Sequence, residues 1–309
     1  MPRASTLIAR PALRRLPTRP SRLVQGLIQR VLPRLFRLQG LELRSGNAAQ
    51  GLAKAFAVQQ AGESTLLIAF RHPSTRDPLV LADLFWNRIP AEAAALLQPL
   101  PRPVELRFLY DRGIPIWAGP VIGWLLQRCG GIAIHRGRLD RPALAQARAT
   151  LVQGRHALLV APEGATNNLS GEMAPLEPGV AQLAFWAADD LTKTNDRREL
   201  QLLPLGIRYS WRQQRWGALD QRLTALETHR GVEPLEEPAE DPISPRRDRL
   251  LRIGAHLMSA LEQLERLNPQ AGQSLTERIE AYRLHGLATA EAHFQLKAGG
   301  TLQERCRRI

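Results

Sequence analysis

Short apolar runs alternate with stretches of helical periodicity between residues 64 and 210, and this alternation constrains the fold more than any other feature of the sequence. Each helical stretch lies between two apolar runs, an order typical of β-α-β units that build a mainly parallel sheet. The predicted strands are Thr65–Arg71, Glu105–Tyr110, Gly131–Arg136, His156–Ala161 and Leu200–Tyr209. The predicted helices are Pro78–Trp86, Pro120–Arg128, Asp140–Gln153 and Pro178–Ala188. We therefore expect an α/β fold with a largely parallel sheet flanked by helices.

The positive charge of the chain is concentrated near its N-terminus. Residues 1–44 contain ten Arg and one acidic residue, so they carry nine of the thirteen net positive charges. Ser21 is a good N-cap for an amphipathic helix that runs to about Leu38, with Arg residues opposite its apolar arc. This helix either packs on its own domain or lies in the interface of an anionic membrane. We predict residues 1–45 as a basic amphipathic segment for membrane association.

Changes in composition divide the rest of the chain. Residues 46–230 are predicted as one α/β domain, 231–246 as an acidic, Pro-rich linker and 247–309 as a C-terminal helical extension. The longest run without charge, residues 113–127, has 15 residues, whereas a spanning helix needs about 20. The two Cys exclude a disulfide scaffold and a four-Cys metal site.

The segment from Phe70 to Pro78 includes the end of the first predicted strand and the residues that directly follow it, which is where doubly wound sheets bind their ligands. A turn started by Pro73 would bring the Asp77 carboxylate onto the imidazole of His72. A carboxylate on one ring nitrogen fixes the tautomer and leaves the other nitrogen able to take a proton from a hydroxyl. The alternative is that Asp77 only caps the helix that follows it.

Three further segments place polar or turn-forming residues at the ends of strands or within one. They are Gly131–Arg138 in and after the third strand, Ala161–Asn167 after the fourth and Leu203–Ile207 in the fifth. With His72-x4-Asp77, they resemble the four ordered motifs of the 1-acyl-glycerol-3-phosphate (lysophosphatidic acid) acyltransferase family of glycerolipid acyltransferases. The resemblance covers about residues 50–210 and implies a glycerolipid acyltransferase-like fold.

The resemblance implies an O-acyltransferase. Such an enzyme moves a fatty acyl group from a thioester, on acyl carrier protein or coenzyme A, to the hydroxyl of a lysolipid, with 1-acyl-glycerol-3-phosphate as the expected acceptor. It implies His72 as general base and Asp77 as the residue that orients it. The implied substrate-binding residues are Arg136, Arg138, Glu163, Gly164, Thr166 and Pro204. No metal and no cofactor other than the thioester co-substrate are implied.

The expected partner is a membrane lipid surface, contacted from the cytoplasmic face as a peripheral protein, and nucleic acid is not an expected partner. Organelle targeting stays open as an alternative, because residues 1–22 are basic, lack acidic residues and contain Ser and Thr.

The third motif departs from the family pattern, which reads Glu-Gly-Thr-Arg. Here Thr166 stands where a phosphate-binding Arg is expected. Either Arg71, Arg76 or Arg138 replaces that cation, or the acceptor is a different lysolipid or alcohol. Two further alternatives are a non-catalytic protein that binds anionic lipid or nucleic acid through its Arg-rich arm, and an acyltransferase fold that has lost its activity.

Overall fold

The computed structural model describes residues 16–135, 139–233, 241–300, 302, 305–306 and 309. The chain divides into two compact units, one ending at Ser210 and the other running from Trp211 to Ile309. The predicted domain boundaries after residues 45, 230 and 246 mark changes in composition and stay predictions.

Within the described residues the first unit contains one parallel sheet of five strands. They are β1 (Ser64–Phe70), β2 (Leu106–Asp111), β3 (Gly131–Ile134), β4 (Ala157–Val160) and β5 (Glu199–Leu205), in the order β3-β2-β4-β1-β5. All neighbouring strands run parallel, so the predicted α/β fold is confirmed. β5 ends at Leu205 rather than at Tyr209 because its only neighbour, β1, ends opposite it at Phe70.

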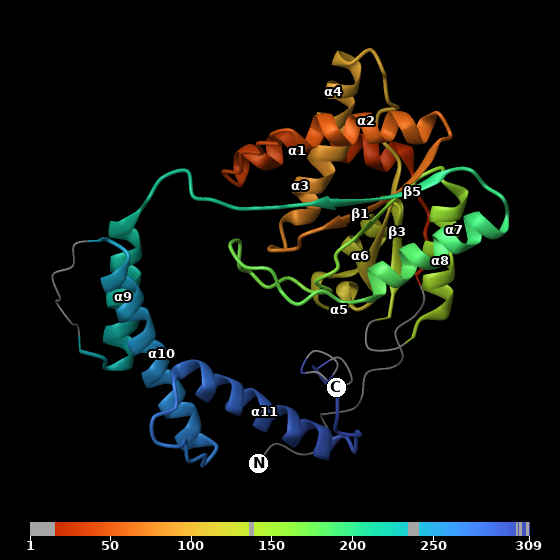
Figure 1. Ribbon diagram of the computed structural model, residues 1–309. Helices are drawn as coiled ribbons and strands as arrows, with labels where there is room; N and C mark the ends of the chain where they lie inside the picture. Colours follow the sequence, from red (N-terminus) through yellow and green to blue (C-terminus); the bar gives the residue numbers. More distant parts are fainter. Residues whose placement is uncertain (1–15, 136–138, 234–240, 301, 303–304, 307–308) are drawn as a thin grey trace. The chain divides into compact units, whose positions relative to one another are not determined.

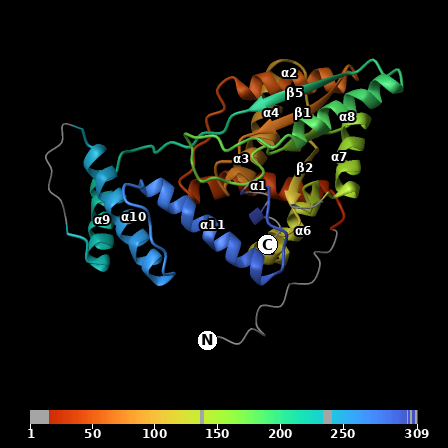
Figure 2. The same cartoon turned by 60° about the horizontal axis from the view of Figure 1, so that its bottom comes forward.

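Both faces of the sheet are covered by helices (Figures 1 and 2). One face carries α1 (Arg22–Leu38), α2 (Ala48–Gln60), α3 (Asp77–Asp83) and α4 (Ile89–Ala95), and a π-helical turn over Leu84–Arg88 joins the last two. The other face carries α7 (Arg141–Gln153) and α8 (Gly179–Lys193). Two further helices, α5 (Ile114–Ala118) and α6 (Pro120–Arg128), lie between β2 and β3 in the chain.

The apolar runs that form β1 and β4 are buried on both sides of the sheet. Successive side chains of a strand point to opposite faces, and in β1 Leu66 and Ile68 join the core under α1–α4 while Leu67 joins the core under α7 and α8. In β4, Leu159 and Leu158 divide in the same way. Burial on both faces explains why these segments are continuously apolar rather than alternating.

Helix α1 packs on the sheet unit with one face and leaves the other exposed. Ser21 caps it as predicted, accepting the Val24 N–H. Leu32 and Phe36 are buried in the same core as α2–α4, whereas Leu23 and Leu27 are exposed. Packing on its own domain is therefore confirmed for one face of this helix, while its predicted contact with a membrane stays a prediction.

The second unit is a set of three helices within the part of the chain that the structure describes. They are α9 (Trp216–Arg230), α10 (Ser244–Leu264) and α11 (Leu275–His293). The latter two agree with the predicted C-terminal helices, and a capping box of Ser274 and Glu277 starts α11. The buried carboxylates of Glu227 and Glu262 pair with Arg side chains of the following helix. Among the described helices, none combines the length and apolar character required to cross a membrane.

Candidate active site

The order of the strands brings three distant segments of the chain to one edge of the sheet. β1 lies between β4 and β5, and the carboxyl ends of parallel strands meet at the same edge. His72 follows β1, Glu163 follows β4 and Tyr209 follows β5. β3 is separated from β1 by two strands, roughly 14 Å at the usual strand spacing. The residues around His72 therefore come mainly from the ends of β4 and β5.

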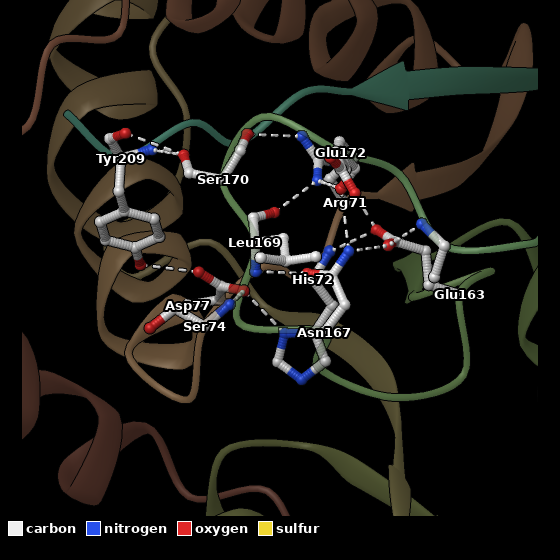
Figure 3. A network of polar contacts seen from close by, with 11 residues as sticks. Arg71, His72, Ser74, Asp77, Glu163, Asn167, Leu169, Ser170, Glu172 and Tyr209 are labelled. Atoms are coloured by element: carbon white, nitrogen blue, oxygen red, sulfur yellow. Dashed lines mark hydrogen bonds and ion pairs between the residues drawn. The ribbon is translucent and has the colours of Figure 1, made fainter. Parts of the chain in front are cut away.

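His72 and Asp77 form the contact that the sequence predicts. The distance from His72 Nδ1 to Asp77 Oδ2 is 2.7 Å. The Asp77 side chain is fully buried, while that of His72 is 24% exposed. Figure 3 shows the imidazole with Nδ1 toward Asp77 and Nε2 turned away from it. With the Nδ1 proton donated to the carboxylate, Nε2 carries the lone pair and is the nitrogen that a substrate can reach.

The alternative role of Asp77 as a plain helix cap is wrong. Asp77 is the first residue of α3, the N-cap position belongs to Arg76, and no side chain caps this helix end. The Asp77 carboxylate instead accepts the backbone N–H of Ser74 at 3.0 Å and the hydroxyl of Tyr209 at 2.6 Å. Its bonds therefore orient the carboxylate against His72 rather than stabilise the end of α3.

Tyr209 is a residue of this site that the sequence analysis did not select. Burial first, and then the Asp77 carboxylate, raise the pKa of Tyr209, so its hydroxyl keeps its proton and donates. The signal in the sequence was its position at the end of the fifth predicted strand, at the same edge as His72. Nothing in the sequence states that this strand lies beside the first.

The Glu163 carboxylate accepts hydrogen bonds from other groups of the protein, including the backbone of His72. The side chain is buried, and Oε1 accepts the backbone N–H of His72 at 3.0 Å. Oε2 accepts the N–H of Ala174 at 2.9 Å and the Asn167 amide at 3.3 Å (Figure 3). Glu163 thus fixes the backbone that carries His72, and its predicted contact with substrate stays a prediction.

Arg71 is not available to replace the missing Arg of the third motif. Its guanidinium donates to the backbone carbonyls of Leu169, Ser170 and Glu172 and lies 3.6 Å from the Glu163 carboxylate. It therefore holds the loop that follows β4. The expectation that Arg71 could bind a substrate phosphate is wrong, because both terminal nitrogens of its guanidinium donate to carbonyls of this loop. Arg76, the second candidate for this cation, is exposed one residue before Asp77.

The other predicted site residues are placed as follows. Gly164 has a φ of +68° and donates its N–H to the Ala161 carbonyl, a turn that favours glycine. Thr166 is half-buried in the loop after β4.

Pro204 is exposed on β5, level with Ala69 of β1, and proline is tolerated on such an edge strand. Arg136 and Arg138 lie outside the described residues.

A hollow lies at the opposite edge of the sheet. It has a volume of about 540 Å³ and is lined in part by Gly62, Glu63 and Arg198, which precede β1 and β5. The Arg198 guanidinium donates to the carbonyls of Gln153 and Val152 and pairs with Asp196. This hollow is therefore at the amino ends of the strands, away from the carboxyl edge that carries His72.

The arrangement can accept a proton from a hydroxyl at His72 Nε2 and stabilise the resulting imidazolium through Asp77. Residues 54–207, about half of the chain, match the family model described as "Acyltransferase". Neither the comparison with curated proteins nor that with solved structures found a match. Both His72 and Asp77, with the sheet that positions them, lie inside the matched residues. Residues 54–207 therefore form an acyltransferase domain of the glycerolipid acyltransferase family.

Proposed function

We propose that this protein is an O-acyltransferase that moves a fatty acyl group from an acyl thioester to the hydroxyl of a lysolipid. The observation that carries the proposal is the 2.7 Å contact between His72 Nδ1 and the buried Asp77 carboxylate, within a domain of the acyltransferase family. The contact leaves Nε2 for the substrate, which a general base for a hydroxyl requires.

In the proposed reaction His72 Nε2 takes the proton of the acceptor hydroxyl while its oxygen attacks the thioester carbonyl. The new C–O bond gives a tetrahedral intermediate, and its collapse breaks the C–S bond. The leaving thiolate takes the proton back from the imidazolium, so the products are the ester and the free thiol. Asp77 stabilises the imidazolium between these steps. No Ser or Cys nucleophile is needed, because the acceptor hydroxyl itself attacks.

The test is turnover by purified His72→Ala and Asp77→Asn proteins with acyl thioesters and a panel of lysolipids, read by mass. We expect both variants to lose about 10²–10⁴-fold in turnover because a general base or its orientation is lost. His229→Ala, on the exposed surface of α9, is the matched control and should keep wild-type turnover. Wild-type turnover by His72→Ala would overturn the proposal.

We propose 1-acyl-glycerol-3-phosphate as the acceptor, since it is the substrate of the family that the motifs resemble. Its phosphate requires a cation, and Arg71 is committed to the loop after β4. Arg76, which is exposed beside Asp77, Arg136 and Arg138 are the candidates. The alternative is a lysolipid or alcohol without a phosphate. The same panel distinguishes the two, because only the first predicts preference for a phosphorylated acceptor.

We further propose a peripheral contact with an anionic membrane through α1, α5 and α6, at the cytoplasmic face. Leu23 of α1 is 88% exposed and Trp117 of α5 is 71% exposed. The start of α1 lies against the end of α6, since Ser21 N–H donates to the Arg128 carbonyl at 2.9 Å. Exposed Trp and Leu favour the interface, and the Arg residues of this segment favour anionic headgroups.

Vesicle sedimentation with full-length protein tests this contact. The double variant Leu23→Gln and Trp117→Gln should bind anionic vesicles several-fold more weakly, because two exposed apolar anchors are lost. Phe185→Gln is the matched control, since Phe185 is an exposed aromatic residue on α8. Equal loss in both variants would mean that exposed apolar area in general, and not this surface, binds the vesicle. Binding without any acyl transfer by wild type would favour the non-catalytic alternative.

A further inference from the structure

The Asp77 carboxylate is held from two sides by segments that are distant in sequence. Oδ2 faces His72 Nδ1 and also accepts the backbone N–H of Ser74, and both donors belong to the turn that precedes α3. Among the described residues, Oδ1 accepts one hydrogen bond, from the hydroxyl of Tyr209 beyond β5, at 2.6 Å. Because the Asp77 side chain is fully buried, a donor removed from Oδ1 is not simply replaced by bulk water.

The Tyr209 bond constrains what the other two bonds leave adjustable. A carboxylate turns easily about its Cβ–Cγ bond, since this torsion is broad. Two donors on Oδ2 hold that oxygen, and a third donor on Oδ1 fixes the plane of the whole group. The plane of the carboxylate sets the direction in which His72 Nδ1 donates, and with it the direction of Nε2.

Tyr209 is itself anchored by the loop that follows β4. Its backbone N–H donates to the Ser170 hydroxyl oxygen, and the Ser170 hydroxyl donates to the Tyr209 carbonyl at 2.8 Å. The Ser170 carbonyl in turn accepts a bond from Arg71 at 2.9 Å. Arg71 precedes His72, so the contacts run from His72 through Asp77, Tyr209, Ser170 and Arg71 back to the start (Figure 3).

We infer that Tyr209 is a positioning residue for the proposed reaction, acting on His72 through the carboxylate of Asp77. This inference rests on the proposed function of His72 as general base. It assigns no contact between Tyr209 and substrate. A bond from a hydroxyl to a carboxylate is charge-assisted, and its loss is expected to reduce turnover by about 10-fold.

The charges around the pair determine the expected pH dependence. Asp77 of α3 faces His72, and Tyr209 from the segment after β5 faces the other oxygen of Asp77. Arg76 stands at the start of α3, Glu163 binds the His72 backbone, and Arg71 lies beside Glu163. Removing the Tyr209 hydroxyl leaves more negative charge on the carboxylate and so favours the imidazolium. The acid limb of the activity profile should therefore move to higher pH in Tyr209→Phe.

Steady-state kinetics of the full-length protein test the inference, with the thioester and lysolipid that wild type uses. Tyr209→Phe should lower kcat about 10-fold, leave KM within about 2-fold and shift the acid limb upward. Tyr110→Phe is the matched control, because Tyr110 is buried and its hydroxyl has no hydrogen-bond partner among the described residues. This control should change neither kcat nor the pH profile.

A double-mutant cycle separates positioning from a general structural effect. In an Asp77→Asn background, Tyr209→Phe should reduce kcat by less than about 2-fold, because the carboxylate that it orients is absent. Fully additive losses, or an unchanged kcat and pH profile in the single variant, would overturn the inference while His72→Ala remained inactive. If His72→Ala kept wild-type turnover, the proposed function would fail as well, and the two failures are therefore distinguishable.

Discussion

Replacing Glu163 should destabilise the sheet unit more than any exposed substitution in the same loop. The side chain is buried and accepts the backbone N–H groups of His72 and Ala174. Its carboxylate also faces the guanidinium of Arg71 at 3.6 Å. Removing it leaves three part-buried donors, the Asn167 amide among them, and one cation without this acceptor.

The size of the effect follows from these contacts. Each buried donor left without an acceptor costs about 1–3 kcal/mol, and breaking a buried ion pair by removing one partner costs about 3–5 kcal/mol. Because these contacts share one carboxylate, Glu163→Ala should cost about 3–5 kcal/mol of unfolding free energy in total. Glu163→Gln keeps one carbonyl oxygen but presents an NH₂ group to the other donor, and should cost about 1–3 kcal/mol.

Hydrogen exchange measures this effect within the sheet unit itself. Amides of β1 report its global unfolding, and the amides of His72 and Ala174 report local opening. The β1 amides and the amides of His72 and Ala174 should all lose protection in Glu163→Gln. Glu172→Gln, on an exposed side chain of the same loop, should change the free energy of unfolding by less than about 0.5 kcal/mol. Equal protection in wild type and Glu163→Gln would refute the role of Glu163 as a backbone anchor.

Two further predictions concern the thiols and the acceptor. Burial raises the pKa of Cys129 to about 11. Iodoacetamide at pH 8 should therefore modify the exposed Cys306 first, and modification of Cys129 should increase as the pH rises toward 11. Peptide mass analysis measures both. Arg76→Ala or Arg136→Ala should raise KM for a phosphorylated acceptor by about 10–150-fold and leave KM for a neutral one nearly unchanged. If the substitution changed KM equally for both acceptors, that Arg would not bind the phosphate.

Strands β1 and β4 could be predicted from the sequence because their apolar runs are buried on both faces of the sheet. Helix α2 was not predicted, although its buried residues Ala49, Leu52, Ala53 and Phe56 follow helical spacing. Two of these four are alanines, whose small side chains give a weak periodic signal. The order of the strands could not be predicted at all, because it depends on how the helices pack and not on any one segment.

The site was predictable only where it is local in the chain. His72 and Asp77 are joined by one turn, so their contact follows from a short segment. Tyr209 lies 132 residues from Asp77, and their contact requires β5 to lie beside β1. The hydrogen bonds from Arg71 to the loop after β4 could not be predicted for the same reason, since they depend on β4 being the other neighbour of β1.

The residue of the third motif that departs from the family pattern, Thr166, lies apart from the contacts that hold His72 and Asp77. Glu163 and Gly164, which match the pattern, have internal roles, one binding the His72 backbone and the other making a turn with positive φ. Thr166, which departs from it, lies half-buried in the loop and is separate from these contacts. The replacement of the expected Arg by Thr166 therefore leaves the hydrogen bonds around His72 and Asp77 complete, which argues against the alternative of a fold that has lost its activity. Because these contacts are complete, we propose that the missing Arg affects which acceptor is bound rather than whether a hydroxyl is activated.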